Sequence, residues 1–66
     1  MIRYRLELSP DDNDTVLVTS SDLPGLVTYG EDRASALENA VDAAETLLAR
    51  KVVLDYETTS LVVAEA

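Results

Sequence analysis

One segment of the sequence has the periodicity of an amphipathic helix, and it lies in the second half of the 66 residues. Asp32, directly before this segment, is predicted to cap the helix by accepting hydrogen bonds from first-turn N–H groups. Alanine is frequent among the apolar residues, so the helix is predicted to pack closely on a flat partner, most simply a β-sheet. The apolar residues are spaced three and four apart, which places them on one helical face: Ala36, Leu37, Ala40, Val41, Ala44, Leu47 and Leu48.

Three segments before the helix are predicted to be strands. Apolar and polar residues alternate over residues 2–8, and residues 15–19 are rich in β-branched side chains. The acidic turn at residues 9–14 should join these two strands as an antiparallel hairpin. The third strand, residues 26–29, follows a Pro-Gly turn in which the glycine can take a positive φ. Because this connection is short, the third strand should lie antiparallel to the second.

The segment after the helix leaves one choice open. Residues 52–54 fit either a last helical turn or a short strand. Residues 56–60 are predicted to form a loop, and residues 61–64 are predicted to form a final strand. The predicted fold class is α+β, with the order βββαβ and a small sheet that carries one helix on one face. One helix covers one sheet face only, so the other face is left to solvent or to a partner. A chain of this size without disulfide or metal is marginally stable, and association into a homodimer or higher homo-oligomer is expected to stabilise it.

The acidic composition excludes several classes of binding protein. Thirteen Asp and Glu residues stand against five Lys and Arg residues, which gives a formal net charge of −8. Direct nucleic-acid binding and adhesion to anionic membranes both require clustered cations, so neither is expected. The hydrophobic fraction of 47% is too high for a disordered acidic tail. With no secretory signal and no apolar run long enough to cross a membrane, we expect a cytoplasmic protein.

The missing residue types exclude most catalytic chemistry. The sequence has no histidine and no cysteine, which removes the usual general base, thiolate nucleophiles and zinc–thiolate sites. The acidic turn at residues 11–14 does not fit a calcium loop, because Leu17 and Leu23 stand where that loop needs Gly and Glu. We therefore expect no catalytic residue, no cofactor and no metal. A small hydrolase that uses carboxylates and a metal ion is kept as the alternative from the enzyme class.

Two motifs resemble a known family. The first is Asp22-Leu23-Pro24-Gly25 followed by Thr28 and Gly30, and the second is Ala36-Leu37-Glu38-Asn39-Ala40 in the helix. At this distance from each other they are similar to the N-terminal domain of HicB antitoxins. The resemblance spans residues 2 to about 50, with Leu26 where the family commonly has Cys. It implies a degenerate ribonuclease-H-like fold without catalytic acids, which associates through its sheets.

The resemblance also implies a function. Such domains bind HicA toxins, which are small basic ribonucleases that cut mRNA, and mask their active sites. Family members typically continue into a DNA-binding segment, whereas residues 1–66 are expected to form a single HicB-like domain without one. The sequence is thus expected to be an antitoxin-like binding module of a toxin–antitoxin system. Alternatives are an acidic nucleic-acid mimic, a phage-borne inhibitor of a nucleic-acid-binding enzyme, and a solitary oligomerisation domain.

Two groups of residues are expected to contact the basic partner. Carboxylates at the hairpin turn and in the following loop should pair with its Lys and Arg residues. An apolar patch around Leu23, Leu26 and Tyr29, next to Pro24, should form the desolvated centre of the interface. The expected acidic contacts are Asp11, Asp12, Asp14 and Asp22.

Overall fold

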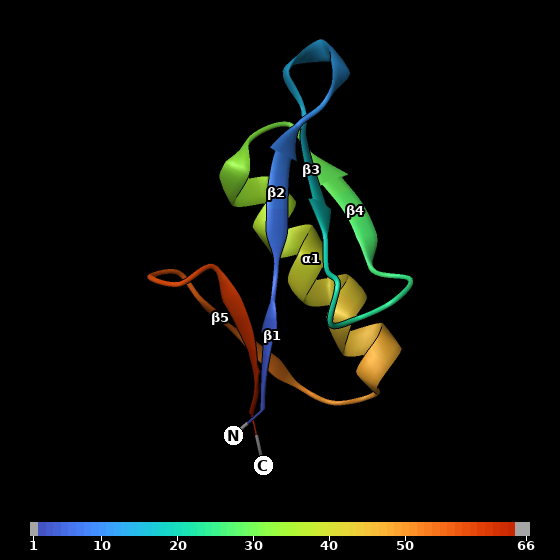
Figure 1. Cartoon of the computed structure of the whole chain (residues 1–66), viewed down its shortest axis with the longest axis vertical. Coiled ribbons are helices and arrows are strands. Elements are labelled where there is room, and N and C mark those ends of the chain that lie inside the picture. Colours follow the sequence, from blue (N-terminus) through green and yellow to red (C-terminus); the bar gives the residue numbers. More distant parts are fainter. Residues whose placement is uncertain (1, 65–66) are drawn as a thin grey trace.

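The N-terminal strand takes part in two small sheets (Figure 1). In the computed structural model, which describes residues 2–64, Leu6 divides this strand into β1 (Arg3–Arg5) and β2 (Glu7–Pro10). One antiparallel sheet has the order β1–β6–β5 and the other the order β2–β3–β4. The predicted α+β class is confirmed. The other elements are the 3-10 turn η1 (Asp12–Asp14), β3 (Val16–Thr19), β4 (Val27–Gly30), α1 (Arg33–Leu48), β5 (Val52–Asp55) and β6 (Ser60–Val63).

The strand exchanges its neighbour at Leu6. Before this residue it pairs with β6, and the Leu6 N–H still donates a hydrogen bond to the carbonyl of Thr59 at 3.2 Å. From Glu7 onward it pairs with β3 on its other side, with Glu7 opposite Thr19. The two sheets are therefore joined by one continuous strand. Leu6 lies at the junction and is buried in the core.

Side chains of the β3–β4 loop take the place of a neighbouring strand beside Arg5. The Arg5 N–H donates to Asp22 Oδ2 at 2.9 Å, and the Arg5 carbonyl accepts from Ser20 Oγ at 2.7 Å. The same buried Ser20 hydroxyl oxygen accepts from the N–H of Leu23 at 3.2 Å. The loop is thus fastened to the strand next to the point where the strand changes sheets.

The helix begins and ends for identifiable reasons. Asp32 has extended backbone angles, and its Oδ1 accepts from the N–H of Ser35 at 2.8 Å, which confirms the predicted N-cap. At the other end, Ala49 adopts the left-handed conformation with φ 54° and ψ 37°, and the helix stops at Leu48. A left-handed residue in this position is a common helix terminator, and glycine usually occupies it.

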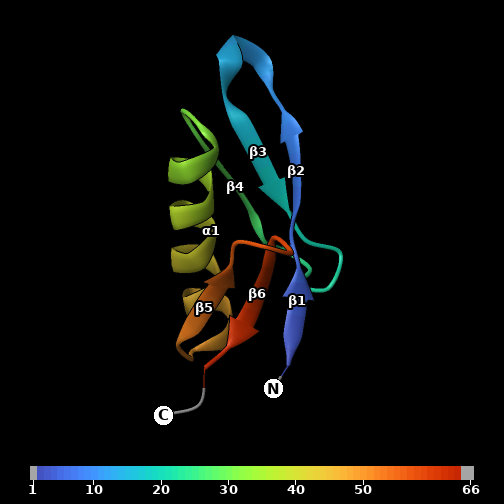
Figure 2. The same cartoon turned by 90° about the vertical axis from the view of Figure 1, so that its left-hand side faces the viewer.

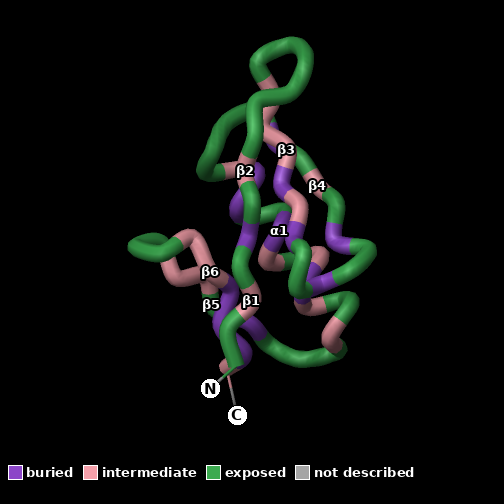
Figure 3. The backbone as a smooth tube through the Cα atoms, viewed as in Figure 1, coloured by how far each residue is buried: buried purple, intermediate pink, exposed green. Residues whose placement is uncertain are grey.

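The alanine face of α1 lies against the strands, as predicted (Figure 2). Four helix residues are completely buried, and Figure 3 shows the buried backbone positions where the helix and the strands meet. They pack with strand and loop residues that include Val18, Leu26 and Leu61. Leu47 is the exception in the predicted stripe, because it is 49% exposed. The buried helix residues are Ala36, Leu37, Ala40 and Ala44.

The predicted order βββαβ in one small sheet is wrong in two respects. The first predicted strand is divided into β1 and β2, which lie in different sheets, and β5 is an additional strand. Residues 52–54, which fitted either a helical turn or a strand, belong to β5, and β5 pairs with β6 as an antiparallel hairpin. The apolar run was too short for its periodicity to separate the two possibilities. The left-handed Ala49 decides between them by ending the helix before this run begins. The other predicted pairings, β2 with β3 and β3 with β4, are confirmed.

Candidate functional site

The face of the β2–β3–β4 sheet that points away from α1 carries a group of apolar side chains. Val18 is fully buried under the helix, so its strand neighbours Leu17 and Thr19 point to the opposite face. Tyr29 lies opposite Leu17 and Val27 opposite Thr19 in the register of β3 and β4. Tyr29 is 64% exposed and Val27 65% exposed. We call Leu17, Val27 and Tyr29 the outer patch.

The acidic residues of the hairpin turn lie at one end of the molecule (Figure 1). Asp11, Asp12 and Asp14 are exposed, and Asn13 and Asp14 have positive φ values of 64° and 63°. Asn and Asp tolerate this conformation better than other side-chain-bearing residues, which explains why the turn is built from them. Both the outer patch and this turn belong to the β3-containing sheet, but the turn extends beyond it.

The loop that resembles the HicB motif does not form the expected apolar patch. Leu23 is 7% exposed and Leu26 only 1%, and both belong to the hydrophobic core. The loop folds inward because Pro24 and Gly25 make a tight turn, in which Leu26 N–H donates to the Leu23 carbonyl at 3.0 Å and Gly25 has φ +94°. The expectation that Leu23 and Leu26 form the centre of an exposed interface is therefore wrong.

The other predicted contact residues are accessible, but one also has a structural role. Pro24, Tyr29 and Asp22 are exposed. Asp22 accepts the backbone hydrogen bond of Arg5, a role that its place in an Asp-Leu-Pro-Gly turn did not reveal. The structure thus places the predicted residues in three locations: the hairpin turn, the core-facing loop and the outer sheet face. Neither of the two pockets described below contains residues from two of these groups.

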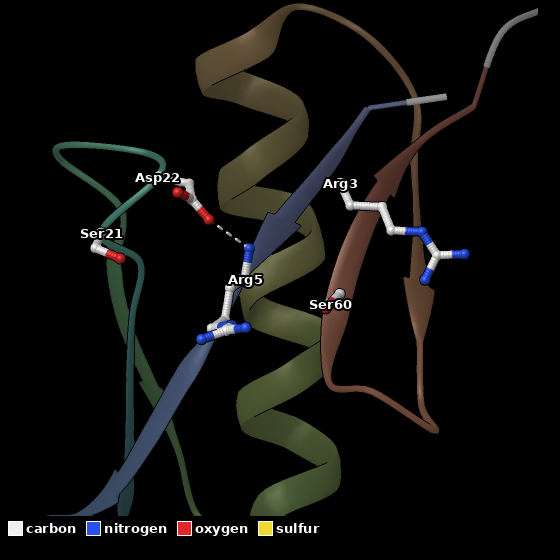
Figure 4. Close-up of a pocket in the computed structure, with 5 residues that line it drawn as sticks. All are labelled: Arg3, Arg5, Ser21, Asp22 and Ser60. Carbon is white, nitrogen blue, oxygen red and sulfur yellow. Dashed lines mark hydrogen bonds between the residues drawn. The ribbon is translucent and has the colours of Figure 1, made fainter.

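A polar pocket that the sequence did not predict lies beside β1 (Figure 4). It has a volume of about 380 Å³ and is lined by both arginines of β1 and by three polar residues. Arg3 and Arg5 are two residues apart on one strand and so point to the same face. Arg3 is paired with Asp55 at 3.1 Å, and Asp22 lies next to Arg5. The Arg3 guanidinium is therefore held by a carboxylate outside the pocket lining, whereas Asp22 binds the backbone of Arg5 and not its guanidinium.

The pKa of the Asp55 carboxyl lies below its ordinary value of 3.8. A hydrogen bond from the Thr58 side chain is the main cause and holds the pKa of Asp55 below that value. Backbone N–H groups of Thr58 and Glu57 and the positive charge of Arg3 lower the pKa further, whereas loss of solvent opposes them. Asp55 is thereby kept charged as the acceptor at the start of the β5–β6 turn.

A second, apolar groove lies on the outside of β5 and β6. It is lined by Val53, Asp55, Val62 and Ala64 and has a volume of about 310 Å³. Val53 is 56% exposed. Together with the outer patch, this groove gives both sheets an apolar region on an uncovered face.

Across residues 2–64, no group of three or more acidic side chains gathers in a way that could hold a metal ion. The helix within this part of the chain is not long and apolar enough to cross a membrane. Comparisons with protein-family models, with curated proteins and with solved structures find no match for this chain.

Proposed function

We propose that this chain is a protein-binding module of the HicB antitoxin kind, which neutralises a small basic ribonuclease of the HicA type by covering its active site. The observation that carries the proposal is the outer patch. Tyr29 and Val27 are each about two-thirds exposed on a sheet face that no part of residues 2–64 covers. In a small protein, aromatic and branched apolar side chains so exposed are typical of an interface centre.

The acidic surplus supports a basic partner. With a net charge of −8, the chain attracts a cationic protein over several ångströms before contact and repels acidic ones. The carboxylates of the hairpin turn, Asp11, Asp12 and Asp14, are exposed and extend beyond the sheet, where they can reach a docked partner. Asp22 and Pro24 offer further exposed contacts in the β3–β4 loop.

The proposal includes the degenerate ribonuclease-H-like arrangement implied by the sequence resemblance. Its support is the α+β class and the succession of the antiparallel strands β2, β3 and β4 followed by α1. The proposal also includes a cytoplasmic location and association into homo-oligomers. In this function no residue of the chain acts as a catalyst. Its contribution is to occlude the surface through which the partner binds RNA.

Binding to a small basic ribonuclease of the HicA type tests the proposal, and a protein of this kind encoded next to this chain would be the first choice. Calorimetric titration should give a complex whose affinity falls as salt rises, because salt screens exposed charges, and the complex should lose mRNA cleavage. Tyr29→Ser should weaken binding at least about tenfold, as expected for an interface centre. Tyr56→Ser is the matched control, because Tyr56 is 63% exposed but lies in the β5–β6 turn. Absence of a complex, or equal losses in both variants, would contradict the proposal.

A further inference from the structure

Two short sheets in one small chain leave several strand edges without a neighbouring strand. β4 and β5 are the outer strands of their sheets. An open edge presents unpaired N–H and C=O groups, to which a strand of another molecule can add. In an antiparallel pair, alternate residues turn both backbone groups toward the neighbour or away from it. The outward groups of each edge can therefore be identified from the hydrogen bonds.

On β4, the outward groups belong to Val27 and Tyr29. The Tyr29 carbonyl accepts from Asn39 Nδ2 of α1 at 2.8 Å and so points away from β3. Val27 lies two residues earlier in the strand and has the same orientation. The side chain of Asn39 thus occupies the middle of the β4 edge, where an added strand would have to form its hydrogen bonds.

On β5, the outward groups belong to Val52 and Leu54. The Ala64 N–H donates to the Lys51 carbonyl at 3.0 Å, so residues 51, 53 and 55 face β6 and the two residues between them face outward. The outward N–H of Val52 donates to Glu45 Oε2 of α1 at 3.3 Å. Glu45 therefore occupies the β5 edge in the way that Asn39 occupies the β4 edge.

On the remaining open sides of the N-terminal strand, one residue is bonded and another lacks a donor. Beside β1, Asp22 and Ser20 take both backbone groups of Arg5. Beside β2, the outward positions are Leu8 and Pro10, because Leu6 two residues earlier bonds toward β6. Proline has no N–H to offer an incoming strand, and it is one of the common means of blunting a sheet edge.

We propose that Asn39 and Glu45 are edge guards, which prevent a second copy of this chain from adding its own β5 or β4 to the sheets. The second copy is the occupant that the β5 edge fits, because two antiparallel β5 strands are self-complementary about a twofold axis. The exposed Val53 side chains would then meet next to the apolar groove. Glu45 opposes this pairing in two ways. Its carboxylate already accepts the hydrogen bond of the Val52 N–H, and the Glu45 carboxylates of the two copies would repel each other near the twofold axis.

The double variant Asn39→Ala/Glu45→Ala tests the proposal by sedimentation velocity over a wide concentration range. We expect species larger than the wild-type state that grow with concentration, while circular dichroism shows a folded chain. Glu38→Ala is the control, because it removes one charge from an exposed position of the same helix. A folded double variant with the wild-type mass at every concentration would overturn the proposal.

A second measurement on the wild type covers the case in which the double variant does not fold. In hydrogen exchange followed by NMR, the guarded amide of Val52 should exchange roughly fivefold to tenfold more slowly than the outward amide of Leu54, in line with the net free energy of one hydrogen bond. Equal exchange rates would show that Glu45 does not close this edge. The test does not involve a basic partner, so its failure leaves the proposed function unaffected.

Discussion

Gly30 lies where the last residue of β4 passes under the first turn of α1, and it leaves no room for a side chain. A Cβ atom on Gly30 would lie 2.3 Å from the backbone N of Ala36 and 2.7 Å from its Cα. Ala36 is completely buried, and the neighbouring Asp32 cap and the Asn39–Tyr29 hydrogen bond fix this turn to β4. The obstructing atoms are backbone atoms, so rotation of a side chain cannot relieve the clash.

The cost of Gly30→Ala follows from this distance. Non-bonded heavy atoms reach favourable contact at about 3.5 Å, so the helix and the strand would have to separate by roughly 1 Å. Overpacking of this kind costs about 1–3 kcal/mol, and a smaller gain of about 0.4–1 kcal/mol comes from the stiffer unfolded chain. Because the backbone must move, we expect a net loss of about 2 kcal/mol. The total stability of a chain this size is on the order of 3–10 kcal/mol.

Urea unfolding followed by far-UV circular dichroism measures the effect. With a slope of about 1 kcal/mol per molar urea for a small protein, the midpoint should fall by about 2 M. Gly25 provides the comparison, because it has φ +94° but nothing within 4 Å of an added Cβ. Gly25→Ala should lose about 1–2 kcal/mol through backbone strain alone.

Substitution by asparagine separates the two reasons for glycine, which are the lack of space at Gly30 and the positive φ at Gly25. Asparagine tolerates positive φ better than alanine, so Gly25→Asn should unfold at higher urea than Gly25→Ala. Gly30→Asn should be worse than Gly30→Ala, because a larger side chain meets the same backbone. If Gly30→Ala unfolds at the wild-type midpoint, or if asparagine is the better substitute at both positions, the close approach of β4 and α1 is not what requires glycine.

Three further substitutions test single interactions. Ser20→Ala should destabilise by about 1–3 kcal/mol, because it leaves the buried Leu23 N–H without a partner, whereas the exposed Ser21→Ala should be neutral in the same urea assay. Ala49→Gly should stabilise by up to about 1 kcal/mol in thermal unfolding, since glycine adopts the left-handed conformation without a Cβ penalty; an unchanged melting temperature would refute this. Asp55 has a folded pKa below its unfolded pKa, so its contribution is present above the unfolded value of about 3.9 and is lost as the pH falls through the lower folded value. Asp55→Asn should therefore lose less stability than wild type between neutral pH and about pH 3 in thermal melts, and parallel losses would count against the shift.

The local elements of the fold were predictable because local chemistry determines them. The Asp32 cap, the alanine face of the helix, the acidic hairpin turn and the Pro-Gly turn each depend on residues within a few positions of one another. The α+β class and the antiparallel pairing of the first strands followed from these elements and from short connections.

The missed features depend on contacts between distant parts of the sequence. The neighbour exchange at Leu6 requires Thr59 on one side and β3 on the other, and no periodicity in residues 2–8 signals it. The Pro-Gly turn folds the loop, but the burial of Leu23 and Leu26 also depends on the Ser20 and Asp22 hydrogen bonds that fasten the loop to the distant Arg5. A loop with a Pro-Gly turn is usually exposed, so the sequence alone favoured an accessible patch where the structure has part of its core.

The proposed edge guards would restrict how a protein partner can bind. Partners that add a strand gain affinity from backbone hydrogen bonds, and here Asn39 already holds the outward carbonyl of Tyr29 in β4 and Glu45 the outward N–H of Val52 in β5. In the proposed function, the partner would then recognise side chains: the apolar centre at Tyr29 and Val27 and the exposed carboxylates of the hairpin turn. Binding of this kind is sensitive to salt and to Tyr29→Ser, but an extended peptide cut from the partner should not reproduce it. A peptide that binds as tightly as the folded partner would show that an edge, and not the outer patch, is the recognition surface.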